Sequence, residues 1–194
     1  LAGEHFEEHP CALELGPGGG ANLWPLALRR FAIAGVDISP SAIAQVRTKL
    51  DKESPGWIEF PGGLIDGSAA SLPFGADEFD LIVDIECVSC LPVELATSAY
   101  KEAYRVAKPG ARLFVQTFGD RTDVGAARPD AGGLLHPTSG PLAVVPGVRL
   151  TSRPREVSAL LGAWEIREIN TSTRTVGGDS ALIEELLIIA DKAH

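Results

Sequence analysis

The sequence has no methionine, only three cysteines, and 17 lysines and arginines against 26 aspartates and glutamates. An odd, small number of cysteines fits a reducing compartment better than a disulfide framework. The net charge of −9 and the scattered arginines disfavour a nucleic-acid surface, which needs a basic stripe. No apolar run approaches the roughly 20 residues that span a bilayer, and no signal-peptide pattern is present. We therefore expect a cytoplasmic protein that binds neither nucleic acid nor membrane.

The remaining composition is that of an ordinary globular protein, with 45% hydrophobic and 22% charged residues. A chain of 194 residues has the length of one domain, so we expect residues 1–194 to form a single unit. Because the chain starts at Leu1 and lacks methionine, we expect the first residues of the gene product to be missing or processed.

A glycine-dense turn is the most informative stretch. The apolar segment 11–15 runs into glycines at four of the five positions 16–20, and a helix-competent segment, 22–31, follows at once. Glycine costs backbone entropy, so such a cluster indicates a backbone that must turn sharply and approach a ligand. A turn of this kind before a helix is typical of nucleotide and nucleoside sites.

Strand and helix patterns alternate along the rest of the chain, which predicts an α/β fold: a doubly wound, mostly parallel sheet with ligands at the carboxyl ends of its strands. A Gly- and Pro-rich stretch, 119–150, shows little periodicity, and we expect it to be functional or disordered. The expected strands are 11–15, 32–38, 57–65, 79–85, 111–118, 164–173 and 181–190, and the expected helices are 22–31, 39–50, 95–106 (stopped by Pro109-Gly110) and 152–161.

The turn alone leaves two ligand classes open. Gly16, Gly18 and Ala21 satisfy the dinucleotide fingerprint, and Asp37 lies 19 residues beyond Gly18, where a ribose-binding acid is expected. Glu14, just before the turn, favours the other class, because a carboxylate beside a pyrophosphate is repelled. It suits a nucleoside with a cationic end and no phosphate.

The motifs in sequence order identify a family. Four stretches resemble the first to fourth motifs of class I S-adenosylmethionine-dependent methyltransferases, and a fifth resembles the lead into their fifth strand: LELGPGGG (13–20), VDISPSA (36–42), DGSAASLPF (66–74), FDLI (79–82) and RVAKPGARL (105–113). The resemblance covers about residues 11–118. It implies a Rossmann-like, seven-stranded methyltransferase sheet whose C-terminal strand pair is antiparallel.

The resemblance also implies roles for residues at the first two motifs. Glu14 would lie near the ammonium end of S-adenosylmethionine, or of its product S-adenosylhomocysteine. Asp37 would accept hydrogen bonds from both ribose hydroxyls, for which a carboxylate is well suited. Ile38 would pack on the adenine face. The loop would pass under the methionine part of the cofactor at its glycines, namely Gly16, Gly18 and Gly20.

Later motifs supply the rest of the implied site. Asp66 would accept from the adenine amino group, helped by the Gly67 backbone and the Ser68 side chain. Asp84 and Ile85, at the end of the fourth strand, would form the floor beneath the methyl-donating region.

Other reactive side chains carry weaker indications. The pair Cys87 and Cys90 is spaced as in redox proteins or half a zinc site, but two further ligands are missing, so no metal is assigned. Related enzymes often carry a histidine or aromatic residue near Cys90, and this sequence does not. His136 in the long loop is the one candidate for a catalytic base.

The sequence therefore predicts an enzyme that moves a methyl group from S-adenosylmethionine to a small-molecule acceptor by in-line displacement. A nicotinamide-dependent oxidoreductase and a non-catalytic nucleoside-binding module remain as alternatives. Because the segment before the first strand is short, we expect either that the chain is trimmed, or that residues 119–150 cover the acceptor, or that the second subunit of a homodimer does.

Overall fold

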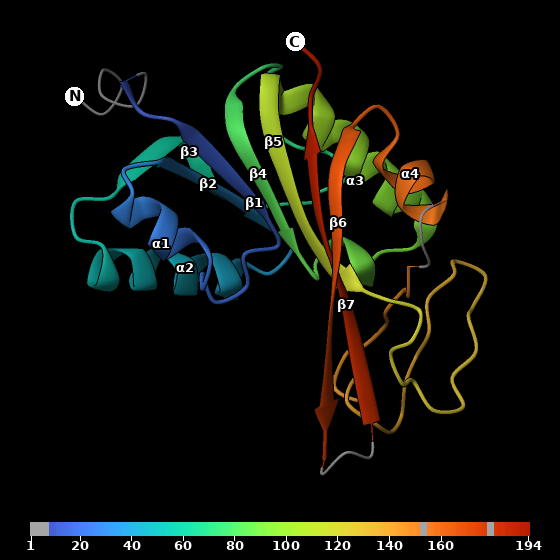
Figure 1. The fold of residues 1–194 in the computed structure, drawn as a ribbon. Helices are drawn as coiled ribbons and strands as arrows, with labels where there is room; N and C mark the ends of the chain where they lie inside the picture. Colours follow the sequence, from blue (N-terminus) through green and yellow to red (C-terminus); the bar gives the residue numbers. More distant parts are fainter. Residues whose placement is uncertain (1–7, 152–154, 178–180) are drawn as a thin grey trace.

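The computed structural model describes residues 8–151, 155–177 and 181–194 (Figure 1). Its seven strands form one sheet in the order β3-β2-β1-β4-β5-β7-β6. The first five strands in this order run parallel to one another, whereas β7 pairs antiparallel with both β5 and β6. The expected doubly wound α/β sheet is thus confirmed. The strands are β1 (Cys11–Leu15), β2 (Ala32–Asp37), β3 (Ile58–Asp66), β4 (Phe79–Ile85), β5 (Ala107–Phe118), β6 (Glu165–Val176) and β7 (Ala181–Asp191).

Helices cover both faces of the sheet (Figure 1). Two of them, α1 and α2, pack on β2 around Leu23, Ile33 and Leu50, and α3 and α4 lie on the opposite face. The start of α2 follows its sequence, because the Ser39 side chain accepts a hydrogen bond from a backbone N–H of the first turn. The helices are α1 (Leu23–Leu28), α2 (Pro40–Glu53), the 3-10 turn η2 (Val88–Cys90), α3 (Val93–Val106) and α4 (Arg155–Leu161).

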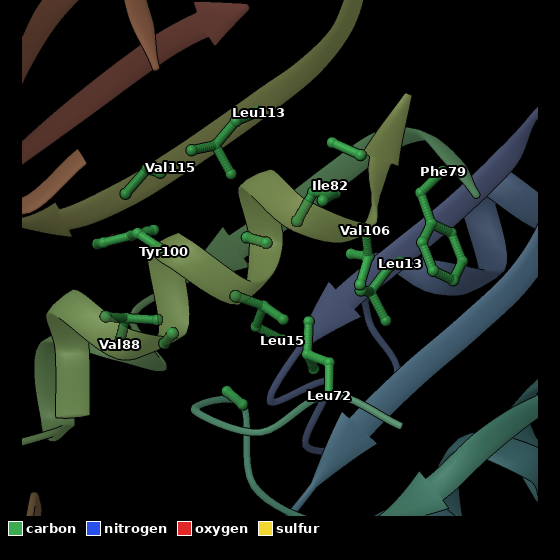
Figure 2. Packing of buried hydrophobic residues seen from close by; sticks show 14 of the residues in the cluster. Leu13, Leu15, Leu72, Phe79, Ile82, Val88, Tyr100, Val106, Leu113 and Val115 are labelled. Carbon is green, nitrogen blue, oxygen red and sulfur yellow. The ribbon is translucent and has the colours of Figure 1, made fainter. Parts of the chain in front are cut away.

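The main core lies between the central strands and α3 (Figure 2). Leu13 and Leu15 of β1 point toward α3 beside Ile82 of β4, and all three are fully buried. Burying each such side chain stabilises the fold by about 1.5–3 kcal/mol. The apolar character of β1 and β4 therefore reflects strands that are covered on both faces.

Several expected boundaries were wrong. Helix α3 ends at Val106, and β5 begins at Ala107, so Pro109-Gly110 lies inside the strand instead of ending the helix. The strand tolerates this pair because the β4–β5 register is irregular here and Gly110 adopts a φ of +79°. Helix α1 stops at Leu28, shorter than expected, and the first residues of the expected helix 152–161 lie outside the described residues.

Segment 119–150 forms no helix or strand of its own, but it packs around an apolar cluster. Leu142 and Val148 contact Phe118 and Ile183, at the ends of β5 and β7. An isolated bridge joins Leu135 to Val148. The segment lies beside the part of β6 and β7 that extends beyond the other strands (Figure 1).

Candidate functional site

The glycine turn is shaped by two close approaches. Gly16 has a φ of +63°, and a Cβ there would meet the thiol of Cys87 and lie 2.7 Å from its Cβ. Gly20 has a φ of +73°, and its Cβ would lie 3.2 Å from the Val46 backbone on α2. Side chains rarely adopt this conformation, and these two positions also lack the space for one. Glycine therefore lets the turn fit between η2 and α2.

Asp37 fastens this turn to the tip of β2. One carboxylate oxygen accepts from the backbone N–H of Gly18 at 3.1 Å, and the other accepts from that of Ser39 at 2.9 Å. Each carboxylate oxygen has a second lone pair, so the group still has capacity to accept from two hydroxyls. The carboxylate is therefore fixed in place without being saturated.

A crevice of about 360 Å³ lies at the carboxyl ends of β1, β2, β3 and β4. Its walls include six of the residues expected at the cofactor: Gly16, Asp37, Ile38, Gly67, Ser68 and Ile85. Ile38 leaves 79% of its surface exposed, although it is a large apolar residue. An exposed isoleucine at the mouth of a crevice offers a flat apolar surface to a ligand ring.

Glu14 lies beneath the turn and is only 1% exposed. One oxygen accepts from the Asn22 side chain at 2.7 Å, and the other, also buried, has no hydrogen-bond partner. Burial is the main reason that its pKa is raised to about 7; Asn22 lowers it, and Asp84 and Asp37 raise it further. An unpaired buried carboxylate oxygen is costly, which fits a site completed by a cationic ligand group.

The Asp84 carboxyl faces α3 and does not line the crevice. One of its oxygens accepts from the backbone N–H groups of Cys87 and Val88, each at 3.1 Å, and the other accepts from the Tyr100 hydroxyl at 2.7 Å. Burial raises its pKa to about 6 against these hydrogen bonds. The structure thus places Asp84 as a link between η2 and α3, next to the expected floor at Ile85.

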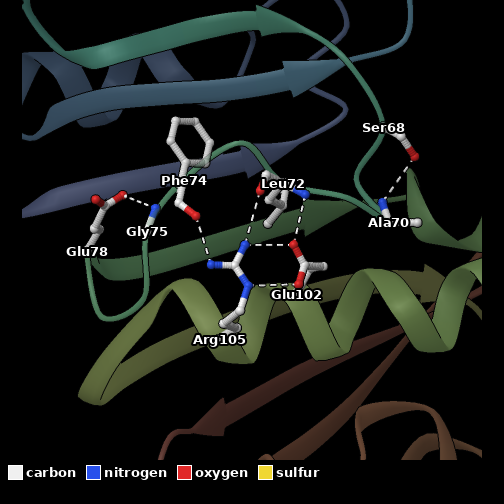
Figure 3. A network of polar contacts seen from close by, with 8 residues as sticks. All are labelled: Ser68, Ala70, Leu72, Phe74, Gly75, Glu78, Glu102 and Arg105. Atoms are coloured by element: carbon white, nitrogen blue, oxygen red, sulfur yellow. Dashed lines mark hydrogen bonds and ion pairs between the residues drawn. The ribbon is translucent and has the colours of Figure 1, made fainter.

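The loop after β3, which the sequence predicts to lie beside adenine, is held by α3 (Figure 3). Arg105 donates to the carbonyl oxygens of Phe74 and Leu72 at 2.8 and 3.1 Å. Glu102 accepts from the Leu72 N–H at 3.0 Å and pairs with Arg105 at 2.7 Å. Asp66 is exposed at the tip of β3, opposite Asp37 in the strand register, and does not line the crevice.

Sequence reasoning missed several crevice residues, because neighbouring elements in the fold bring them there. Cys87 and Cys90 of the η2 turn line it as free thiols, and Pro146 reaches it from segment 119–150. Burial, with a contribution from Asp84, raises the pKa of Cys87 far above its usual range. A thiol with so little thiolate character forms a neutral wall and is a poor redox nucleophile.

His136 lies outside the crevice and its ring is already engaged. One ring nitrogen lies 2.9 Å from a carboxylate oxygen of Asp130, and the other lies 2.7 Å from the carbonyl oxygen of Pro146. These two acceptors raise the pKa of His136, with Asp130 as the larger cause. Both ring nitrogens are occupied by these oxygens, so neither is directed at an acceptor in the crevice, and this geometry weighs against a base.

A larger cavity, of about 430 Å³, lies at the opposite end of the sheet between His9, Phe74 and Lys108. It lies at the amino ends of the strands, where open α/β sheets do not bind their ligands. None of the expected cofactor residues borders it. Among the described residues, no helix is both long and apolar enough to cross a bilayer.

Comparison with known proteins gives one family. The methyltransferase domain family matches residues 13–115, more than half of the chain. Erythromycin 3''-O-methyltransferase of Saccharopolyspora erythraea is 32% identical over 124 residues, which cover 62% of this chain and 38% of that protein. Ubiquinone biosynthesis O-methyltransferase of Pseudomonas putida is 29% identical over 107 residues, 54% of this chain and 43% of that protein. The chain therefore matches about two fifths of the length of these relatives.

The fold comparison covers nearly the whole chain. A S-adenosylmethionine-dependent methyltransferase from Methanosarcina mazei superposes with a TM-score of 0.69 and 25% identity, covering 96% of this chain and 93% of that one. The unpaired buried oxygen of Glu14, the Asp37 carboxylate and the exposed Ile38 lie where the sequence motifs predict contacts to such a cofactor. The chain belongs to the methyltransferase domain family, as a Rossmann-like, class I S-adenosylmethionine-dependent methyltransferase.

Proposed function

We propose that this chain transfers a methyl group to a hydroxyl group of a small molecule. Two of its relatives are named as O-methyltransferases, one for erythromycin and one for ubiquinone biosynthesis. The observation that carries the proposal is the crevice itself, where residues from four strand tips meet. The family match gives no support to the nicotinamide alternative.

The cofactor contacts that we propose follow the sequence motifs. Glu14 holds the ammonium end, Asp37 holds the ribose hydroxyls, and Ile38 covers the adenine. Asp66 and the loop beside it hold the adenine amino group. The remaining contacts come from the turn, the loop and the end of β4: Gly16, Gly18, Gly20, Gly67, Ser68, Asp84 and Ile85, with Asp84 acting by fixing η2 in place.

S-adenosylmethionine supplies an activated methyl group on a sulfonium, which is the hard part of the chemistry. The protein then has to hold the acceptor in line with that group and exclude water. Such positioning contributes up to about 7–11 kcal/mol in favourable cases. The crevice wall at Ile85 and Cys87 is apolar or neutral, so it suits a site from which water is removed.

Two measurements test the proposal. Titration calorimetry should give micromolar or tighter binding of S-adenosylhomocysteine and no heat with NAD(H). Tritiated S-adenosylmethionine should label phenols or sugar hydroxyls. Binding without any labelled acceptor would favour the non-catalytic module, and NAD(H) binding without S-adenosylhomocysteine binding would reject the proposal.

Four further points belong to the same proposal. We propose that residues 1–194 act as one domain, that the protein is cytoplasmic, and that it binds no nucleic acid, in line with its net charge of −9. We also propose a homodimer, whose second subunit helps to cover the acceptor. Sedimentation velocity of the purified chain tests the dimer, and a monomer at micromolar concentration rejects it.

A further inference from the structure

Glu86 has an unusual backbone at the rim of the crevice. It follows Ile85 at the end of β4 and lines the crevice wall, and its φ is +59°. A non-glycine residue in this region is strained and persists only where its surroundings fix it. Here its N–H donates to the Gln116 carbonyl at 2.9 Å, and its own carbonyl accepts from the Ser89 hydroxyl at 3.0 Å.

The Glu86 side chain faces polar groups from three other strands. The Gln116 amide on β5 donates to its carboxylate at 3.4 Å. The Glu185 carboxyl on β7 faces it as a second acid, and Arg174 on β6 pairs with Glu185 at 3.3 Å. The Cys90 thiol of η2 is a further titratable neighbour.

Two facing carboxyls hold a proton more tightly than either alone. Burial is the largest cause that raises the pKa of Glu86, and the charge of Glu185 is the next. Gln116 and Arg174 oppose the rise. The carboxylate is thus a stronger base than an ordinary glutamate.

We propose that Glu86 is the catalytic residue that accepts the proton of a hydroxyl acceptor bound at the crevice, and that Glu185 is its positioning residue. This rests on the proposed function. As the acceptor oxygen bonds to the methyl carbon and the carbon–sulfur bond breaks, the hydroxyl proton passes to the Glu86 carboxylate. Glu86 then releases that proton to water. The products are the methyl ether and a neutral thioether, and general-base catalysis of this kind contributes about 10²–10⁴-fold.

The test compares Glu86→Gln and Glu185→Gln with Glu168→Gln, at an exposed glutamate on β6 whose carboxylate accepts a hydrogen bond from Asn170. Each variant is titrated with S-adenosylhomocysteine, assayed with tritiated S-adenosylmethionine on catechol and methyl glycosides, and titrated without ligand by ¹³C NMR of labelled glutamate. Glu86→Gln should bind S-adenosylhomocysteine within about threefold of wild type and lose about a hundredfold or more of its transfer rate. Glu185→Gln should slow transfer less than Glu86→Gln does, because it leaves a weaker base in place. The NMR midpoint of Glu86 and the rising limb of the pH–rate profile should both move to lower pH.

The outcomes separate this inference from the proposed function. If wild type binds no S-adenosylhomocysteine, the proposed function fails. If it binds but labels neither acceptor class, the hydroxyl acceptor is rejected, and Glu86 as its base with it. Full transfer by Glu86→Gln, or a Glu185→Gln protein with unchanged midpoints, overturns the inference directly. If Glu86→Gln does not fold, Glu86→Asn replaces it, because asparagine tolerates a positive φ better.

Discussion

Replacing Glu14 by glutamine should change how stability depends on pH. The pKa of this buried carboxyl is raised from 4.5 to about 7, mainly by burial. At 1.36 kcal/mol per pH unit, the rise corresponds to about 3 kcal/mol. Between these two pH values the native state holds a proton that the unfolded chain has lost, so the free energy of unfolding falls as pH rises. The contribution of neutral Glu14 is complete below pH 4.5 and lost above pH 7.

Glutamine remains neutral, so Glu14→Gln should be spared this loss. From pH 5 to pH 8, the free energy of unfolding of the variant minus that of wild type should rise by about 2–3 kcal/mol. The new amide has its own buried N–H group, which adds an offset that does not vary with pH. The quantity to measure is therefore how the difference in the free energy of unfolding changes with pH. The size of that difference at any single pH does not test the reasoning.

Urea unfolding of the ligand-free proteins at half-unit pH steps gives this slope. The same substitution at the exposed Glu53 of α2 is the matched control. A difference that stays flat with pH, or that falls as pH rises, would refute the reasoning. The Glu14→Gln substitution should weaken ligand binding, because a neutral amide holds an ammonium group less well than a carboxylate does. The affinity for S-adenosylhomocysteine should drop by about 1–3 kcal/mol.

Three other substitutions test the rest of the site. Asp37→Ala should weaken S-adenosylhomocysteine binding by about 1–3 kcal/mol in calorimetry, and unchanged affinity would remove Asp37 from the site. Tyr100→Phe removes a hydrogen bond to Asp84, whose pKa is about 6, so it should cost about 1–3 kcal/mol of stability at pH 8 and less at pH 5. An equal cost at both pH values would contradict this. Gly16→Ala should reduce stability and affinity more than Gly18→Ala, because both have positive φ but only Gly16 lacks space for a Cβ; equal losses would contradict it.

The layer order was predictable because it depends on local patterns. Strands and helices alternate, and the buried strands are apolar throughout, so the parallel sheet follows from short stretches. The boundary between α3 and β5 was missed because Pro109-Gly110 reads as a helix stop. Its place inside an irregular strand depends on pairing with β4, which the sequence does not display.

The site was predictable at the strand tips and unpredictable between them. Asp37 and Ile38 lie at the end of β2, where the motif and the sheet rule both point. Asp84 was expected to form a floor under the methyl group, but tertiary contacts turn its carboxyl to Tyr100. Pro146 reaches the crevice from a segment without periodicity, so no sequence signal placed it there.

Glu86 was partly predictable from the sequence. It directly follows Ile85, one of the expected residues, so its neighbourhood was visible in the sequence. Its left-handed backbone and its contact with Glu185, nearly a hundred residues later, were not. Only the folded sheet brings those two carboxyls together.

Helix α3 is hydrogen-bonded to both walls of the crevice through two side chains that lie within two turns of each other. Tyr100 holds the η2 side through Asp84, and Arg105 holds the adenine side through the loop at Leu72. Because both side chains belong to the same helix, a movement of α3 would displace both walls together. If this helix moved to suit a new acceptor, the contacts that we propose for the nucleoside would also be disturbed. Segment 119–150 lines the crevice at Pro146 and also holds the η2 side, where Arg149 donates to the carbonyl oxygens of Ser89 and Leu91. Changes that admit a new acceptor should therefore cost less elsewhere in this segment than at Arg149.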